Sequence, residues 1–199
     1  MRAFGLTGDI GCGKSTVSNI LSKYPDVSVF DCDKIAKEIL GDIPRDEIIA
    51  ILGVNVFPQG TLDFKMMSEI IFRDQEKKGL LEDLVHPLVW VDVQEKVNST
   101  NPNNICVVES AIIFETESAC NFLAMIVVVC SKEEQFRRLR ENRHMSDKQI
   151  LDRINQQLPS YKKEQQADFV IQTGCSIPEL KRRVATLYHN LKNHKGNLA

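Results

Sequence analysis

The sequence predicts an α/β protein built on a parallel sheet of five strands, in the order 2-3-1-4-5, with helices on both faces. Two observations carry this prediction. Short apolar runs alternate along the chain with longer segments of helical periodicity, as in sheets that helices cover on both sides. Residues 8–15 also fit the phosphate-loop pattern G-x-x-x-x-G-K-S/T, which joins a strand to a helix in nucleotide-binding proteins.

Five runs of apolar residues, several of them rich in β-branched side chains, predict the strands. In chain order they cover residues 3–6, 27–30, 105–108, 125–129 and 169–171. Such short continuous runs fit strands that are buried on both faces, and the fifth run is the weakest.

Apolar residues three and four positions apart predict the helices between these strands. The helical segments are 17–21, 34–40, 48–52, a long charged region over 61–98, then 132–142, 147–163 and 178–191. Gly79 and Pro87 predict a division of the 61–98 region into at least two helices. Pro178 suits the first turn of the last helix.

The phosphate-loop pattern is filled by Gly8, Gly13, Lys14 and Ser15. Its glycines let backbone N–H groups turn toward phosphate oxygens at a helix N-terminus. Lys14 is expected to reach the β- and γ-phosphates of a nucleoside triphosphate, and the Ser15 hydroxyl to ligate Mg²⁺. The alternative interpretation is an ordinary glycine-rich turn that caps a helix.

Acidic residues follow two of the predicted strands. Asp31 and Asp33 come after the second strand and Glu109 after the third, at the edge where ligands bind in open α/β sheets. Either aspartate can receive the proton of an attacking hydroxyl, and Glu109 can orient Mg²⁺. Alternatively, Asp33 is only the N-cap of a helix that begins at Lys34, and Glu109 is a solvated carboxylate.

Residues 132–163 carry nine Lys or Arg against five Asp or Glu. The clustered arginines are Arg137, Arg138, Arg140 and Arg143. They indicate either a closing lid that stabilises a transferring phosphoryl group or a solvated helix face. His86, a lone histidine in a helical region, is more often structural than catalytic.

The composition is that of a globular protein of one domain, with 43% hydrophobic and 26% charged residues. A net charge of −2 gives no support to bulk electrostatic binding of nucleic acid or an anionic membrane. Six cysteines without a C-x-x-C pair predict reduced thiols and no structural metal. With no signal-peptide pattern in residues 1–20 and no apolar run long enough to cross a bilayer, a cytoplasmic protein is expected.

Taken together, these segments resemble the dephospho-coenzyme A kinase family over nearly the whole chain. The matching segments are 6–16 (family L-T-G-G-I-G-S-G-K-S-T), 31–36 (D-A-D-x-I-A), 71–87 (I-F…L…H-P), 112–115 (P-L-L-F-E), 135–157 and 167–174 (A-D-x-V-I-x-N-x-G). Six matches in the right order make the resemblance specific.

The resemblance implies transfer of the ATP γ-phosphate to the ribose 3′-hydroxyl of dephospho-coenzyme A, with Mg²⁺ as cofactor. The catalytic residues it implies are Asp33 as general base, Lys14 and Arg143. The implied ATP-binding residues are Gly8, Gly11, Cys12, Gly13, Lys14, Ser15, Thr16 and Arg138. The implied acceptor-binding residues are Thr7, Asp33, His86 and Glu109, and Ser15 is the implied metal ligand.

One domain is implied, with a core, an acceptor-binding helical region and a lid. The core covers residues 1–58, 104–134 and 164–199, the acceptor-binding region about 59–103, and the lid about 135–163. The protein is expected to act on these two small molecules as a monomer, with weak self-association possible, and to bind neither nucleic acid nor membrane.

The chain departs from the family pattern at several positions. The departures are Asp9 for Gly, Cys12 for Ser, Glu109 for Asp, Ala111 for Pro and Thr173 for Asn. Asp9 could repel the phosphates or point outward, and Cys12 places an oxidisable thiol beside the nucleotide. The usual lid arginine aligns with Asn142 when Ser146 and Gln157 are matched, with Arg143 beside it.

Two other functions fit parts of the pattern. Another small-molecule or nucleoside monophosphate kinase would share the loop and lid but carry a different acceptor pocket. A nucleotide-dependent switch would share only the loop. The sequence has no N-K-x-D motif for guanine, and a switch would leave Asp33 and the lid arginines without a role.

Overall fold

The computed structural model describes residues 1–196, which fall into two compact units. The first unit consists of residues 1–31 and the chain from residue 97 onward, and the second of residues 32–96. Each unit is described by itself below. No helix among the described residues is long and apolar enough to cross a membrane.

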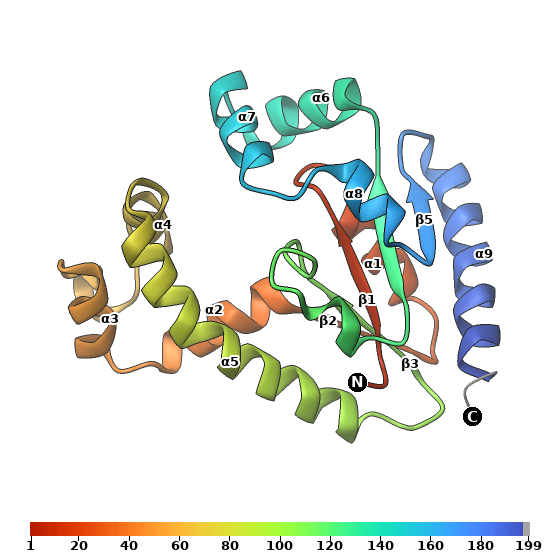
Figure 1. Ribbon diagram of the computed structural model, residues 1–199, viewed down its shortest axis with the longest axis horizontal. Helices are drawn as coiled ribbons and strands as arrows, with labels where there is room; N and C mark the ends of the chain where they lie inside the picture. The colour runs from red at the N-terminus through yellow and green to blue at the C-terminus, as the bar shows by residue number, and fades with distance from the viewer. Residues whose placement is uncertain (197–199) are drawn as a thin grey trace. The chain divides into compact units, whose positions relative to one another are not determined.

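The first unit contains the sheet. Its strands are β1 (Phe4–Gly8), β2 (Val27–Asp31), β3 (Ile105–Glu109), β4 (Met125–Val129) and β5 (Phe169–Gln172). All neighbouring strands are parallel, in the order β2-β3-β1-β4-β5 (Figure 1). The predicted strands and their order are therefore confirmed. Since all strands run the same way, Gly8, Asp31 and Glu109 end on one edge of the sheet.

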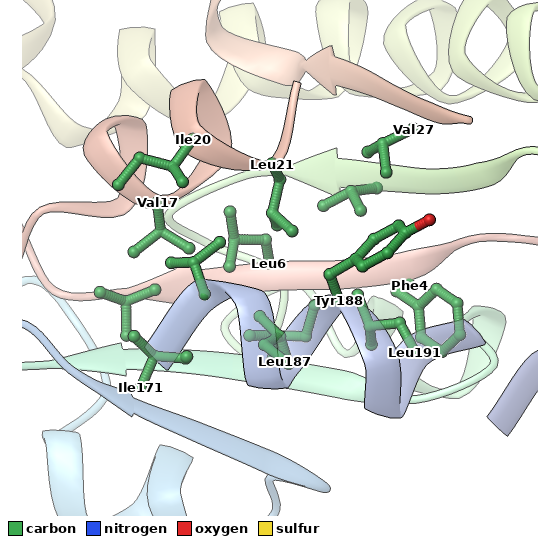
Figure 2. Packing of buried hydrophobic residues seen from close by; sticks show 14 of the residues in the cluster. Phe4, Leu6, Val17, Ile20, Leu21, Val27, Ile171, Leu187, Tyr188 and Leu191 are labelled. Carbon is green, nitrogen blue, oxygen red and sulfur yellow. The ribbon is translucent and has the colours of Figure 1, made fainter. Parts of the chain in front are cut away.

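The helices of the first unit are α1 (Lys14–Leu21), α6 (Lys132–Arg143), α7 (Asp147–Asn155), α8 (Ser160–Gln165) and α9 (Ile177–Gly196), with a 3₁₀ turn η2 (Ser118–Asn121). Of these, α1, α8 and α9 pack against the sheet, and α6 packs with α7. On one face α1 and α9 pack over β1, as Figure 2 shows for Leu6, Val17 and Leu187. Alternate residues of β4 point to the other face, where Met125, Val127 and Val129 form a second cluster.

The second unit is helical. It contains α2 (Cys32–Asp42), α3 (Arg45–Leu52), the 3₁₀ turn η1 (Pro58–Gly60), α4 (Phe64–Arg73) and most of α5 (Gln75–Ser99). A stripe at every fourth position of α5 is buried, comprising Leu81, Val85, Val89 and Val93. The Asp63 carboxylate caps α4 by accepting hydrogen bonds from the N–H groups of Lys65 and Met66.

The predicted breakpoints at Gly79 and Pro87 are wrong, because both residues lie inside α5. The division falls instead at Asp74, whose carboxylate accepts a hydrogen bond from Lys77 N–H at the start of α5. Pro87 is exposed, so water can bond the Asp83 carbonyl that loses its helical partner.

The single helix predicted over 147–163 is also wrong, since α7 ends at Asn155 and α8 begins at Ser160. Pro159 explains this break, because the residue before a proline is disfavoured in helical conformation.

Candidate functional site

The loop between β1 and α1 adopts a backbone that its glycines make possible. Gly8 has φ 148° and Gly11 has φ 79°, both in the region that side chains disfavour. A Cβ on Gly8 would lie 2.2 Å from the Val128 carbonyl oxygen, and one on Gly11 would lie 2.8 Å from Leu139 Cγ. The loop ends at Lys14, where the first N–H groups of α1 lack partners within the helix. This is the geometry of an anion site.

Lys14 folds back over this loop. Its ammonium donates a hydrogen bond to the Gly8 carbonyl at 2.8 Å and contacts the Asp9 carbonyl at 3.5 Å. The positive charge therefore lies over the backbone that would surround a phosphate.

Glu109 at the end of β3 lies beneath the start of α1. Its two carboxylate oxygens accept hydrogen bonds from Ser15 Oγ at 3.0 Å and Ser18 Oγ at 2.6 Å. The side chain is only 6% exposed, so the alternative of a solvated strand-end carboxylate is wrong. In the sheet, Glu109 aligns with Leu6 of β1 on one side and Asp31 of β2 on the other. The buried Thr7 hydroxyl nearby on β1 has no hydrogen-bond partner among the described residues.

Asp9 neither faces a phosphate position unpaired nor points into solvent. Its carboxylate accepts a hydrogen bond from the Ser160 hydroxyl and lies 3.2 Å from the Lys163 ammonium. Lys163 is fully buried and also pairs with Glu115 at 2.8 Å. Glu115 in turn accepts a hydrogen bond from Leu158 N–H at 2.8 Å. The loop is thus tied to α8 through the buried ammonium of Lys163, which pairs with the buried Asp9 and the partly buried Glu115.

Two glutamines hold the middle of the loop. Gln157 accepts a hydrogen bond from Ile10 N–H at 2.9 Å, and Gln135 Nε2 donates one to the Ile10 carbonyl at 2.7 Å. Gln135 lies near the beginning of α6, and Gln157 lies in the segment after α7, 22 residues later in the chain. The backbone of the loop tip is therefore fixed by both sides of the segment predicted as a lid.

Arg138 of α6 lies against the same loop. Its guanidinium donates hydrogen bonds to the Thr173 hydroxyl at 2.9 Å, the Thr173 carbonyl at 2.7 Å and Glu134 at 2.7 Å. The Thr173 hydroxyl donates to the Cys12 carbonyl at 2.6 Å. Thr173, which replaces the family's Asn, therefore joins Arg138 to the backbone of the phosphate loop.

The remaining clustered arginines lie in exposed places. Arg137 pairs with Glu134 and Glu141, and Arg140 pairs with Asp147. The hydrogen bond from Arg137 lowers the pKa of Glu134 to about 2; burial opposes this shift, and the hydrogen bond from Arg138 adds to it. Arg137 and Arg140 thus form a solvated helix face, which is one of the two interpretations given above for the clustered arginines. Arg143, the last residue of α6, is exposed.

A hollow of about 500 Å³ borders this part of the site. It is lined by residues after β4 and β5 together with α6 and α9, among them Ser131, Glu134, Arg137, Gly174 and Arg183. Its position beside Arg138 and Thr173 makes it a candidate for a part of the ligand beyond the phosphates.

Two predicted site residues belong to the second unit. Asp33 is exposed in the first turn of α2, which begins at Cys32 directly after β2. The helix therefore starts before Lys34, and Asp33 is not the residue that precedes it. His86 is half-buried in α5.

Several residues that contact the loop or Glu109 were not predicted from the sequence. They are Ser18, Gln135, Gln157, Ser160 and Lys163. Gln135 and Gln157 were recognised only as part of a family pattern. Ser18, one turn after Ser15 on α1, could have been found from helical spacing. Lys163 gave no signal, because it lies in a charged segment 154 residues from Asp9.

The oxygen ligands near the phosphate loop suit a hard cation. No group of three or more His, Cys, Asp or Glu among the described residues could hold a metal ion by itself. Mg²⁺ commonly binds through one or two protein oxygens together with substrate phosphates and water. The Ser15 hydroxyl, with Glu109 behind it, fits that pattern.

Comparisons with known proteins point to one family. The family model described as dephospho-CoA kinase matches residues 2–179. A dephospho-CoA kinase of Bdellovibrio bacteriovorus is 35% identical over 201 residues, covering 97% of this chain and 99% of the relative.

Solved structures give the same result. The dephospho-CoA kinase of Campylobacter jejuni is similar with a TM-score of 0.73 and 27% identity, over 98% of both chains. TT1252 from Thermus thermophilus is similar with a TM-score of 0.82 and 26% identity, over 95% of this chain and 97% of the other.

Proposed function

Since the chain belongs to the dephospho-CoA kinase family, we propose that it transfers the γ-phosphate of ATP to the ribose 3′-hydroxyl of dephospho-coenzyme A, giving coenzyme A and ADP. This reaction is the final step of coenzyme A biosynthesis. The observation that carries the proposal is the phosphate loop with Lys14 above it and the Glu109–Ser15 pair beside it.

ATP binds, in this proposal, with its phosphates in the loop. The residues assigned to it are Gly8, Gly11, Cys12, Gly13, Lys14, Ser15, Thr16 and Arg138. The hydrogen bonds that hold Ile10 and Cys12 support this assignment, because donors fixed in advance need no reorganisation when the phosphates arrive. The hollow beside Thr173 is large enough to take part of the nucleoside.

Mg²⁺ is the proposed cofactor, held by Ser15 and oriented by Glu109. When bound with ATP, it would neutralise charge on the β- and γ-phosphates. The hydrogen bond between Ser15 and buried Glu109 supports this role, since second-shell carboxylates orient ligands in metal sites.

Dephospho-coenzyme A is the proposed acceptor. Thr7, Asp33, His86 and Glu109 are assigned to its binding, together with the helical region at about 59–103. The Thr7 hydroxyl supports this, because a buried hydroxyl without a protein partner is available to a ligand.

In the transfer itself, the acceptor oxygen attacks the γ-phosphorus while the bond to the β-phosphate oxygen breaks and ADP leaves. Asp33 receives the proton of the acceptor hydroxyl. Lys14 and Arg143 stabilise the charge on the transferring group, with the segment at about 135–163 acting as a lid that excludes water. Asp33 follows the end of β2 by two residues, so the chain keeps it close to the carboxyl edge of the sheet.

The test is ADP release by purified protein with ATP and Mg²⁺, alone and with dephospho-coenzyme A, AMP, dTMP or shikimate. We expect strong stimulation by dephospho-coenzyme A only, with coenzyme A as product. Lys14→Met serves as the inactive control for contaminating kinases. Stimulation by a different acceptor would keep the phosphate-loop assignment and overturn the acceptor, whereas acceptor-independent hydrolysis would favour a nucleotide-dependent switch.

The proposed setting is the cytoplasm, with the protein acting as a monomer on two small molecules, without nucleic acid or membrane. All six cysteines are free, as is usual for proteins of a reducing compartment.

A further inference from the structure

We propose that Cys12 and Cys130 are a modification site, at which a hydroperoxide forms a reversible disulfide that disables the phosphate loop. Their Sγ atoms lie 3.4 Å apart, although the residues are separated by 118 positions in the chain. The consequence for ATP rests on the proposed function, whereas the disulfide itself does not.

The pair joins two rigid parts of the first unit. Cys12 lies in the loop, 2% exposed, between Gly11 and Gly13. Cys130 directly follows β4 and is half-buried, so a small oxidant can reach it from solvent. A disulfide needs a sulfur–sulfur distance of about 2.05 Å. The sulfurs must therefore approach by about 1.4 Å from their present 3.4 Å.

Cys130 is the more reactive of the two. The hydrogen bond with Cys12 and then the charge of Arg138 lower the pKa of Cys130, although burial opposes this. Conversely, the interaction with Cys130 and then burial raise the pKa of Cys12. The thiolate is the nucleophilic form of cysteine, so Cys130 reacts first and Cys12 resolves.

The chemistry proceeds in two steps. The Cys130 thiolate attacks one oxygen of the hydroperoxide, the O–O bond breaks, and an alcohol (or water from hydrogen peroxide) leaves after taking a proton. Cys130 is then a sulfenic acid. Cys12 sulfur attacks Cys130 sulfur, the S–O bond breaks, and hydroxide leaves as water with the Cys12 proton. A dithiol reductant reverses the reaction by exchange.

The disulfide affects the loop because the backbone of Cys12 is hydrogen-bonded to another part of the site. Its carbonyl accepts the hydrogen bond from Thr173, which also holds Arg138. A catalytic site displaced by about 1 Å can lose on the order of 100-fold in rate. We expect the loop backbone to take up part of this approach, which displaces the groups that surround the phosphates and strains the Thr173–Arg138 connection.

The test begins with the cross-link. Full-length protein carrying Cys120→Ser is treated with hydrogen peroxide, quenched with catalase, alkylated and digested with trypsin and Glu-C without reductant. The Cys120→Ser change leaves Cys130 as the single cysteine of peptide 118–132, and Cys120 itself is exposed. We expect peptide 118–132 joined to peptide 3–14, which contains Cys12.

With Cys12→Ser, we expect a dimedone adduct on Cys130 instead. Absence of the joined peptides, or prior modification of other cysteines, would overturn the proposal.

The second part measures function on the same samples. We expect oxidation to lower kcat/KM for ATP about 100-fold, with recovery on adding dithiothreitol. Cys130→Ser, which removes the reactive thiol outside the binding loop, should keep its activity under the same peroxide. A complete cross-link with unchanged ATP binding by calorimetry would overturn the disabling effect. A cross-link that abolishes ATP binding in a protein inactive toward dephospho-coenzyme A would contradict the proposed acceptor and leave this inference standing.

Discussion

The phosphate loop and the two exposed residues assigned to the chemistry, Asp33 and Arg143, differ in how much support the fold gives them. Loop residues Asp9, Ile10 and Cys12 are each bonded to side chains from distant parts of the first unit. Asp33 and Arg143 are exposed, each near one end of a helix. Because the contacts of the loop are present without ATP, we expect ATP binding to depend mainly on the loop and turnover to depend on the two exposed residues.

The largest expected effect is on turnover when the proposed base is removed. Asp33→Asn should lower kcat by roughly 10²- to 10⁴-fold, because the amide cannot receive the acceptor proton. Steady-state kinetics with dephospho-coenzyme A measures it. Glu38→Gln, an exposed acid on the same helix, is the matched control and should retain its kcat. Near-normal turnover of Asp33→Asn would remove Asp33 from this role.

The next effect concerns the buried cluster that holds the loop. Lys163→Met leaves the buried Asp9 carboxylate and the partly buried Glu115 carboxylate without their cation. The expected cost is about 3–5 kcal/mol of unfolding free energy, or roughly 10 °C in Tm. Thermal and urea unfolding measure this loss. Lys162→Met changes an exposed neighbour and should shift Tm little. Equal Tm values for the two variants would show that the cluster does not stabilise the fold.

A smaller effect is expected where α6 meets the loop. Arg138→Met removes three hydrogen bonds of one guanidinium, two to Thr173 and one to Glu134. The Kd for ATP should rise about 10- to 100-fold, since charged hydrogen bonds contribute about 1.5–3 kcal/mol. Calorimetric titration gives the value. Arg140→Met removes an exposed arginine of the same helix that does not line the hollow, and it should change the Kd little. Equal effects of the two substitutions would argue against a specific role for Arg138.

The smallest effect lies away from the site, where α9 meets the start of β2. Burial raises the pKa of Asp26, but hydrogen bonds from Tyr188 and Lys192 lower it overall from 3.8. A lowered folded-state pKa stabilises the fold above the unfolded pKa, and this stability is lost as pH falls through the folded value. Asp26→Asn should therefore cost under about 1 kcal/mol at pH 7 and progressively less in acid.

Urea unfolding of the wild type and of Asp26→Asn, from pH 7 down into the acid range, measures the difference in their free energies of unfolding. Tyr188→Phe removes the principal donor and should reproduce much of the same pH dependence. A cost that stays constant down to the acid limit would show that the Asp26 charge is not responsible.

The sheet and its functional edge could be predicted from sequence because their signals are local. Short apolar runs located every strand, and parallel pairing then brought Glu109 to the same edge as Gly8. The loop was predictable because the two glycines of its pattern, Gly8 and Gly13, both have a backbone conformation that side chains disfavour.

Errors arose where one local signal competed with another. Pro87 indicated a helix break, but its exposed position lets α5 continue, while Asp74 capped the helix where no break was expected. Pro159 divided α7 from α8 although the helical pattern ran on.

The partners of the loop could not be predicted for a different reason. The Asp9–Lys163 ion pair and the Cys12–Cys130 contact join residues more than 100 positions apart, and neither has a pattern of spacing. The alternatives for Asp9 were repulsion or exposure, because its cation was invisible in the sequence. Such contacts follow from the packing of α8 and β4 around the loop, which only the fold reveals.

The double variant Asp33→Asn/Arg143→Met tests most directly whether ATP binding depends on the loop and turnover on these two exposed residues. Calorimetry would give its Kd for ATP with Mg²⁺, and initial rates would give its turnover with dephospho-coenzyme A. We expect a Kd within about twofold of wild type and a turnover at least roughly 10³-fold lower. A Kd weakened as much as the turnover would contradict this division, because ATP binding would then depend on the exposed residues.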